Sequence, residues 1–266
     1  MTQASISYHI RSLEKWLAAP LFERLPRSVQ LTEIGRGYLP AIRRALDDLS
    51  LATTDLFGAA SKRSISIQAP TAFAALWLAP RLHGFASAYP ETEIRLQTVN
   101  WPTVGAEEDI DIDIRYGDGS WPDLTSELLL DEPAVAVCAP ALAAGRAGDA
   151  TAFTDLPLIH VLGTGDLWES FSRESGGKGL ATRKLLKVDS SVVALEMAAS
   201  GLGIALVLRC FASPYLASGR LVRPLTVEIA TGQAHYLVAS LQPRQTSREV
   251  AACLAWLRQE AGQAAG

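Results

Sequence analysis

The sequence predicts an α/β protein in two parts, a small head of helices with one hairpin and a larger body of alternating strands and helices. The 266 residues are enough to build two hydrophobic cores. In residues 1–57 apolar side chains recur at helical spacings, whereas from residue 64 onward short β-branched runs alternate with helical patterns. Such alternation is typical of mostly parallel sheets. We therefore assign residues 1–57 to the head and 64–266 to the body, joined by a linker at 58–63.

The first element of the head is an amphipathic helix over residues 2–18. Thr2 is a suitable N-cap, and apolar residues follow it at spacings of four, three and four: Ile6, Ile10, Leu13 and Leu17. The other faces carry polar side chains that can reach base edges and phosphates of DNA. A solvated helix surface has the same pattern, so this helix alone leaves both interpretations open.

A short hairpin and a long helix follow. Residues 20–31 read as strand, turn and strand, with Arg24 and Arg27 near the tip, where a winged helix-turn-helix places cations against phosphates. Thr32 is the expected cap of the long helix, and Pro40 predicts a kink or a late start. Residues at alternating spacings of three and four form a coiled-coil seam with one polar position, Thr53: Leu39, Ile42, Leu46, Leu49, Thr53 and Leu56. A helix packed on its own core is the alternative.

Charge is distributed unevenly between the two parts. The net charge is −4, but the first 63 residues hold nine Lys and Arg against six Asp and Glu, whereas the remainder holds fifteen against twenty-two. A basic head on an acidic body suits a protein that meets DNA with one end only.

Strands and helices of the body can be placed from their periodicity. The clearest period-2 run is Ile110–Ile114, in which isoleucine alternates with aspartate. Earlier strands are predicted around Ile65–Ile67 and Ile94–Leu96, with a helix between them. Further strands are expected near 134–138, 158–162, 184–188, 203–208 and 235–240, and helices near 191–200 and 246–261.

Two helix starts in the body are candidate ligand sites. Thr71 is the expected cap of the helix after the first strand, and Ser190 with Ser191 the expected caps of the helix before residue 201. Helix starts offer unpaired N–H groups and a positive dipole end, and ligands of open α/β sheets bind beyond the carboxyl ends of strands. Arg115 lies at such an end and is able to pair with a ligand carboxylate, or instead with a nearby aspartate.

The sequence lacks the features that an enzymatic, metal-binding or membrane function needs. The four histidines are scattered without metal-ligand spacing, and no G-x-S-x-G elbow is present. Residues 175–179 are not a P-loop, because Gly179 stands where that motif requires Ser or Thr. The three cysteines are expected to be buried small hydrophobes, since Cys138 and Cys253 stand between apolar residues, with a redox-sensing pair as the alternative. Without an apolar run of roughly 18 residues or a signal peptide, we expect a cytoplasmic protein that uses no metal or cofactor.

Several segments carry a resemblance to a known family. Thr2–Glu14, Pro20–Arg24 and Leu31–Gly35 resemble, in order and spacing, the DNA-binding signature of LysR-type transcription regulators, a highly specific combination. Three downstream segments are similar to the subgroup with the glycine-cleavage activator and the β-lactamase regulator: Trp77–Leu82, Asp111–Gly117 and Trp121–Leu124. The resemblance covers essentially the whole chain.

The resemblance implies a winged helix-turn-helix, a linker helix that dimerises, and a two-lobed effector domain like periplasmic binding proteins, with dimers pairing into tetramers on DNA. We place lobe I at 64–138 plus 235–266 and lobe II at 139–234. In the family two helices precede the segment that starts at Thr2, so the helix-turn-helix is predicted to be partial and its DNA binding weakened. A misassigned start, a cloned fragment and a true truncation all remain open.

We therefore interpret the sequence as a regulator that binds double-stranded DNA and senses an acidic or zwitterionic small molecule. Candidate base contacts are Gln3, Ser7, Tyr8 and His9, and candidate phosphate contacts are Arg11, Arg24 and Arg27. Candidate effector contacts are Thr71, Asn100, Trp101, Arg115, Tyr116 and Ser191. One rival is a solute receptor without a DNA role, which needs a signal peptide, and another is an α/β enzyme, which needs a reactive group beside a base.

Overall fold

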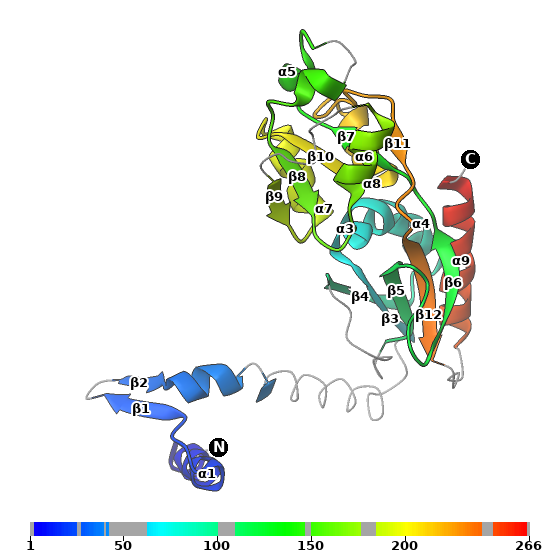
Figure 1. The fold of residues 1–266 in the computed structure, drawn as a ribbon. Coiled ribbons are helices and arrows are strands. Elements are labelled where there is room, and N and C mark those ends of the chain that lie inside the picture. Colours follow the sequence, from blue (N-terminus) through cyan, green and yellow to red (C-terminus); the bar gives the residue numbers. More distant parts are fainter. Residues whose placement is uncertain are drawn as a thin grey trace. The chain divides into compact units, whose positions relative to one another are not determined.

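The computed structural model describes residues 3–25, 28–39, 41–42, 63–100, 110–146, 150–176, 185–240 and 247–264. The chain divides into two compact units, Met1–Ser61 and Lys62–Gly266 (Figure 1). The division falls inside the segment 58–63 that the sequence predicts as a linker.

The N-terminal unit contains a helix, a hairpin and the start of a second helix. Helix α1 spans Gln3–Leu17, strands β1 (Phe22–Leu25) and β2 (Ser28–Leu31) pair antiparallel, and a helix begins at residue 33. The order of helix, hairpin and second helix start agrees with the prediction. Much of the predicted seam lies outside the described residues, namely Leu46, Leu49 and Leu56.

Hydrogen bonds hold the hairpin between the two helices. Glu14 Oε1 accepts from the backbone N–H groups of Leu21 at 2.8 Å and Phe22 at 3.0 Å, which ties α1 to the first strand. Thr32 Oγ1 accepts from the N–H of Gly35 at 3.0 Å, so the predicted helix cap at Thr32 is confirmed. The Thr32 N–H in turn donates to the carbonyl of Leu21 at 3.0 Å.

The larger unit holds two five-stranded sheets. The first has the order β4-β3-β5-β12-β6, with β3 Arg63–Pro70, β4 Thr92–Val99, β5 Ile112–Gly117, β6 Leu124–Leu130 and β12 Ala234–Ser240. The second has the order β11-β7-β10-β8-β9, with β7 Ala134–Val137, β8 Leu158–Val161, β9 Leu185–Val188, β10 Ile204–Leu208 and β11 Glu228–Ile229.

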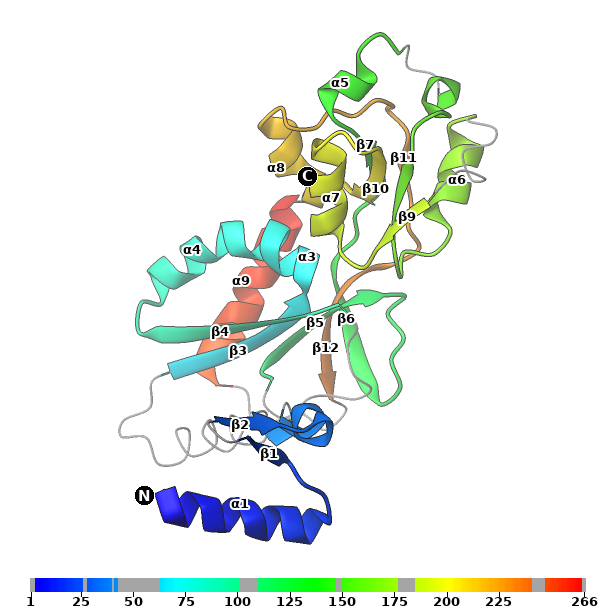
Figure 2. The same cartoon turned by 90° about the vertical axis from the view of Figure 1, so that its left-hand side faces the viewer.

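Helices cover the sheets and bury their apolar faces (Figures 1 and 2). After β3, the helix α3 (Thr71–Phe73) continues through a π-helical turn η1 (Ala74–Leu78) into α4 (Ala79–Ala88). Together with α9 (Arg248–Ala264) it packs on the first sheet, where Ile65, Ile67 and Leu257 are fully buried. The second sheet carries α6 (Leu167–Glu174), α7 (Ser191–Ala199) and α8 (Arg209–Ala217), and the short α5 (Pro140–Ala143) and 3-10 turn η2 (Ala150–Phe153) lie in the same lobe.

Two expectations about the sheets were wrong. In each sheet two pairings are parallel and two antiparallel within the described strands, so the sheets are mixed rather than mostly parallel. The strand predicted near 134–138 was placed in lobe I, but β7 pairs with β10 and β11 in the second sheet. The chain therefore passes to the second sheet at 131–133 instead of after 138, because the fully apolar β7 is buried on both faces there.

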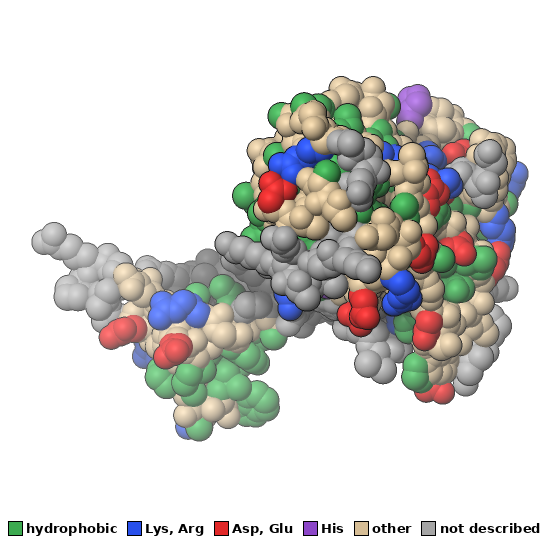
Figure 3. Space-filling view, turned by 45° about the horizontal axis from the view of Figure 1, so that its top comes forward, with side chains coloured by type: hydrophobic (Ala, Val, Ile, Leu, Met, Phe, Trp, Pro, Cys, Tyr) green, Lys and Arg blue, Asp and Glu red, His purple; other side chains and the backbone are tan. Residues whose placement is uncertain are grey.

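A group of ion pairs lies where the chain crosses between the sheets. The first crossing is at 131–133, and the chain returns at 230–233. Arg209, at the start of α8, places Nε 3.2 Å from buried Glu132 and another guanidinium nitrogen 3.4 Å from Glu228. One side chain of the second lobe thus contacts the first crossing and the strand before the second. Elsewhere on the face of this unit seen in Figure 3, cationic and anionic side chains are interspersed.

Candidate functional site

A cavity of about 130 Å³ is lined by residues from both sheets of the larger unit. Parallel strands point their carboxyl ends toward it: β3 and β4 of the first sheet, and β8, β9 and β10 of the second. This is the place where open α/β sheets bind ligands. The wall is mainly apolar, with a few polar groups from helix starts and strand ends, as is usual for small-molecule sites.

The two predicted helix starts both reach the cavity, but only one has the predicted cap. Ser190 is the N-cap of α7, and its hydroxyl accepts from the N–H of Val192 at 3.3 Å. The prediction that Thr71 caps its helix was wrong, because the N-cap residue is Pro70 and no side chain caps this start. Thr71 instead is the first helical residue, and its half-buried side chain lines the cavity. Its hydroxyl is thus not used as a helix cap.

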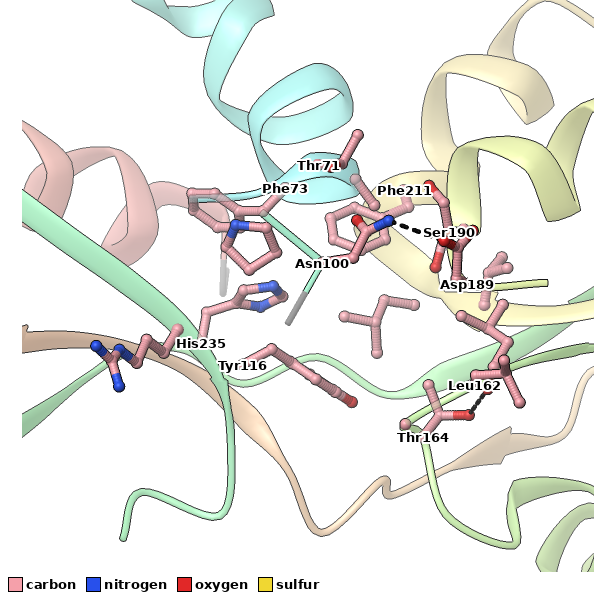
Figure 4. A pocket seen from close by; sticks show the side chains of 18 of the residues that line it. Thr71, Phe73, Asn100, Tyr116, Leu162, Thr164, Asp189, Ser190, Phe211 and His235 are labelled. Atoms are coloured by element: carbon pink, nitrogen blue, oxygen red, sulfur yellow. Dashed lines mark hydrogen bonds between the residues drawn. The ribbon is translucent and has the colours of Figure 1, made fainter. Parts of the chain in front are cut away.

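Asn100 and Asp189 meet at the cavity from opposite sheets (Figure 4). Asn100 follows β4, Asp189 follows β9, and the amide Nδ2 of Asn100 donates to Oδ2 of Asp189 at 3.3 Å. Asp189 precedes Ser190 at the start of α7, where the helix dipole favours a negative charge. The structure therefore places a carboxylate beside two helix starts.

His235 forms the deep end of the cavity, although sequence reasoning did not select it. It lies on β12, is only 2% exposed, and points into the cavity between the rings of Phe73 and Tyr116 (Figure 4). Ring centroids are 4.6 Å from Phe73, 4.9 Å from Tyr116 and 5.8 Å from Phe211. Burial lowers the pKa of His235 to about 3, so the imidazole is uncharged at neutral pH.

Arg115 lines the cavity, but its charge is already matched by a carboxylate. Its side chain is 2% exposed, and its Nε donates to Oδ2 of Asp113 at 2.7 Å. Residues 113 and 115 share one face of β5, whereas Ile114 and Tyr116 point to the other face. Of the two interpretations left open by the sequence, the structure favours the structural partner of an aspartate.

The remaining candidates divide as follows. Thr71, Asn100, Tyr116 and Ser191 all line the cavity with Arg115, whereas Trp101 lies outside the described residues. Burial raises the pKa of Tyr116. Sequence reasoning missed Phe73, Asp189, Phe211 and His235. The available signal for His235 was a lone histidine in the apolar strand predicted near 235–240, which by itself does not distinguish a core position from a ligand contact.

The DNA-contact candidates belong to the N-terminal unit. Tyr8, His9 and Arg11 are exposed on α1, with Tyr8 70% exposed, and Ser7 is half-buried. Arg27 and the side chains of Gln3 and Arg24 lie outside the described part of the chain. Ile10, Leu13 and Leu17 are half-buried on α1, as expected for the predicted apolar stripe.

Other site types find little support in the described ranges. His, Cys, Asp and Glu side chains there form no group that would hold a metal ion. Each described helix is too short or too polar to span a bilayer. The three cysteines are unpaired, and burial raises the pKa of Cys138 to about 11 and those of Cys210 and Cys253 to about 12. High pKa values make these thiols poor nucleophiles.

Comparison with known proteins gives two family matches that together cover nearly the whole chain. Residues 58–262 match the LysR substrate binding domain, and residues 1–36 match the bacterial regulatory helix-turn-helix protein of the lysR family. The glycine cleavage system transcriptional activator of Escherichia coli K12 is 34% identical over 241 residues, covering 90% of this chain and 78% of the relative. The HTH-type transcriptional activator AmpR of Pseudomonas aeruginosa is 32% identical over 262 residues, covering 97% and 86%.

Solved structures agree with these matches. The effector domain of AmpR from Pseudomonas aeruginosa has a TM-score of 0.67 and 27% identity, covering 76% of this chain and 96% of that chain. CrgA, a LysR-type transcriptional regulator from Neisseria meningitidis, has a TM-score of 0.63 and 20% identity, covering 98% and 90%, a likeness of fold. The helix-turn-helix match does not favour the alternative of a solute receptor without a DNA role.

Proposed function

The chain belongs to the LysR family of bacterial transcription regulators, and we propose that the cavity between its two sheets binds an acidic or zwitterionic effector that controls DNA binding. The protein is a regulator with an effector-binding domain and not an enzyme. We further propose that it acts in the cytoplasm. Exposed side chains of α1 would contact the DNA, namely Tyr8, His9 and Arg11. Additional DNA contacts would come from Gln3, Ser7, Arg24 and Arg27.

The observation that carries the effector proposal is the meeting of two helix starts at one cavity. The helix that starts at Thr71 follows a strand of the first sheet, and α7 follows a strand of the second. Both helix starts line the cavity. Helix starts favour anionic groups. Asp189 beside them would bind a cationic group, so a ligand with both charges matches better than a neutral one. A ligand held by both lobes binds one lobe arrangement more tightly and shifts the population toward it.

We propose a homodimer, and a tetramer on DNA, formed through the helix that begins at residue 33 and that the sequence predicts to be long. Leu39 and Ile42 continue the predicted seam into the described part of this helix, and both are half-buried. Sedimentation or light scattering of the Leu46→Asp, Leu49→Asp double variant tests this interface. An unchanged assembly in that variant would contradict it.

The effector proposal is tested by ligand screening coupled to DNA binding. Millimolar dicarboxylates, hydroxy acids, L-amino acids and neutral apolar compounds are screened by thermal shift. DNA fragments selected by the protein from a random pool are used for fluorescence anisotropy. We expect at least one charged compound to raise the melting temperature and to change DNA affinity. Ser191→Leu, which places a larger side chain in the cavity wall, should abolish both effects, whereas Ser213→Leu at an exposed position of α8 should keep them. Stabilisation by neutral apolar compounds alone would overturn the proposal.

A further inference from the structure

His235 carries a buried polar atom that the described part of the protein leaves without a partner. Its Nδ1 is fully buried and has no hydrogen-bond acceptor or donor among the described residues. The imidazole ring packs against three aromatic rings, those of Phe73, Tyr116 and Phe211. Buried polar atoms are nearly always hydrogen-bonded in folded proteins, so an exception in a cavity wall indicates a missing partner.

The cavity itself supplies the place for that partner. His235 lines it and points into it, which places the imidazole at the surface that a bound molecule would touch (Figure 4). Tyr116 adds a second polar atom at the same end, a buried hydroxyl that lies near the side chain of Thr231 but has no partner within hydrogen-bond distance in the described structure. The deep end of the cavity is therefore apolar in area but has two uncharged polar atoms.

We propose that His235 is the specificity-determining residue of this cavity, and that it forms a hydrogen bond with an uncharged polar group at the inner end of the effector. The inference rests on the proposed function, because it assumes that the cavity is the effector site. A charged group is excluded from this end because Phe73, Phe211 and the neutral imidazole offer no countercharge.

The opposite end of the cavity fixes the class of molecule. Asp189 would pair with an ammonium group, and the N–H groups at the start of α7 would receive a carboxylate. The volume of about 130 Å³ is close to the roughly 150 Å³ of an apolar cavity that binds benzene, so the ligand is small. These features together describe an α-amino acid whose side chain ends in an uncharged hydrogen-bonding group.

The test uses pairs of amino acids that differ only in that group. Binding to the whole chain is measured by calorimetry for L-threonine against L-valine, L-asparagine against L-leucine, and L-tyrosine against L-phenylalanine. In at least one pair we expect the polar member to bind about tenfold tighter, the size of one hydrogen bond. L-Glutamate and L-lysine should bind more weakly than that member. Equal or weaker binding of every polar member overturns the proposal, as does failure of all six to bind.

Two variants separate the hydrogen bond from the shape of the site. His235→Phe keeps an aromatic ring and should lose the preference for the polar member, whereas His235→Asn keeps a polar atom near the Nδ1 position and should retain it. An unchanged preference for the polar member in a folded His235→Phe protein would contradict the role of His235. If that variant does not fold, the binding of the amino-acid pairs to the wild-type protein tests the proposal. The proposed function fails separately, when no dicarboxylate, hydroxy acid or amino acid changes DNA affinity.

Discussion

Asn100 donates from Nδ2 to Oδ2 of Asp189 over 3.3 Å, and this bond joins the end of β4 in the first sheet to the end of β9 in the second. Both side chains are exposed, so the bond adds little to the stability of the protein. Its importance lies in where it is, because the two residues line the cavity from opposite lobes. A change of charge at Asn100 or Asp189 therefore affects the contact between the lobes more than the hydrophobic core of either lobe.

Asn100→Asp should therefore be more destabilising than Asn100→Ala. The aspartate would face Asp189 with a like charge, whereas the alanine only removes an exposed hydrogen bond. We expect a difference of about 0.5–1 kcal/mol in the free energy of unfolding at low salt. Urea denaturation at low and high ionic strength measures it, and the difference should shrink with salt because exposed charges are screened. A difference that does not depend on salt would contradict the electrostatic explanation.

Arg115→Gln should destabilise the protein far more than an exposed ion pair would. The variant leaves the buried Asp113 carboxylate without the guanidinium that lies 2.7 Å away. Breaking one partner of a buried pair costs about 3 kcal/mol or more. The double variant Asp113→Asn, Arg115→Gln removes both charges and should recover part of this loss. Urea unfolding of the two proteins is the measurement, and equal stability of the single variant and wild type would show that Arg115 is not a structural partner.

The sequence predicted most elements of the body but not how the lobes divide. Strands at 158–162, 184–188, 203–208 and 235–240 and the helix at 191–200 were placed within two residues, because apolar periodicity is a local signal. Strand pairing is not local. The apolar run of β7 fits either sheet, and its partners β10 and β11 lie about 70 and 95 residues further along the chain.

The candidate site shows the same division between local and long-range information. Thr71, Tyr116 and Ser191 were selected because helix starts and strand ends can be recognised from neighbouring residues. His235 was missed because it reaches the cavity only through the pairing of β12 with β5, which sets it opposite Tyr116. Arg115 was ambiguous because its side of β5 depends on which face of the sheet the helices cover.

Stability should fall as the pH falls through the range in which His235 titrates in the unfolded chain. The pKa in the folded protein is about 3, below the value of about 6.5 for an unfolded chain. Only the unfolded state binds the proton between these values, so the contribution is complete above pH 6.5 and is lost toward pH 3. From pH 7 to pH 5 the loss is about 2 kcal/mol.

Urea unfolding of wild type and His235→Phe at both pH values tests this contribution. The variant should lose about 2 kcal/mol less than wild type over the same interval. His160, whose pKa is lowered by burial, titrates equally in both proteins and cancels in the comparison. The same pH dependence in wild type and variant would show that the imidazole titrates normally and is not enclosed as the structure has it.

Gly35→Ala should weaken DNA binding, whereas Gly37→Ala, two residues further along the same helix, should not. A Cβ on Gly35 would lie well inside van der Waals distance of the carbonyl oxygen of Leu21 and 3.0 Å from Leu31 Cδ2, whereas a Cβ on Gly37 meets nothing within 4 Å. The Leu21 carbonyl already accepts from the N–H of Thr32, so backbone on both sides would have to shift.

The backbone shift caused by Gly35→Ala would separate the first turn of the helix that begins at residue 33 from the hairpin. Glu14 ties this hairpin to α1. We expect a loss of about 2 kcal/mol in stability of this unit and at least a tenfold loss of DNA affinity. Gly37→Ala should keep or raise stability, since alanine is the better helix former by about 1 kcal/mol. Fluorescence anisotropy on the selected DNA at fixed salt, with circular dichroism melting, compares the two variants. If Gly35→Ala bound DNA as tightly as Gly37→Ala, the close contact between hairpin and helix would have no part in positioning α1 on DNA.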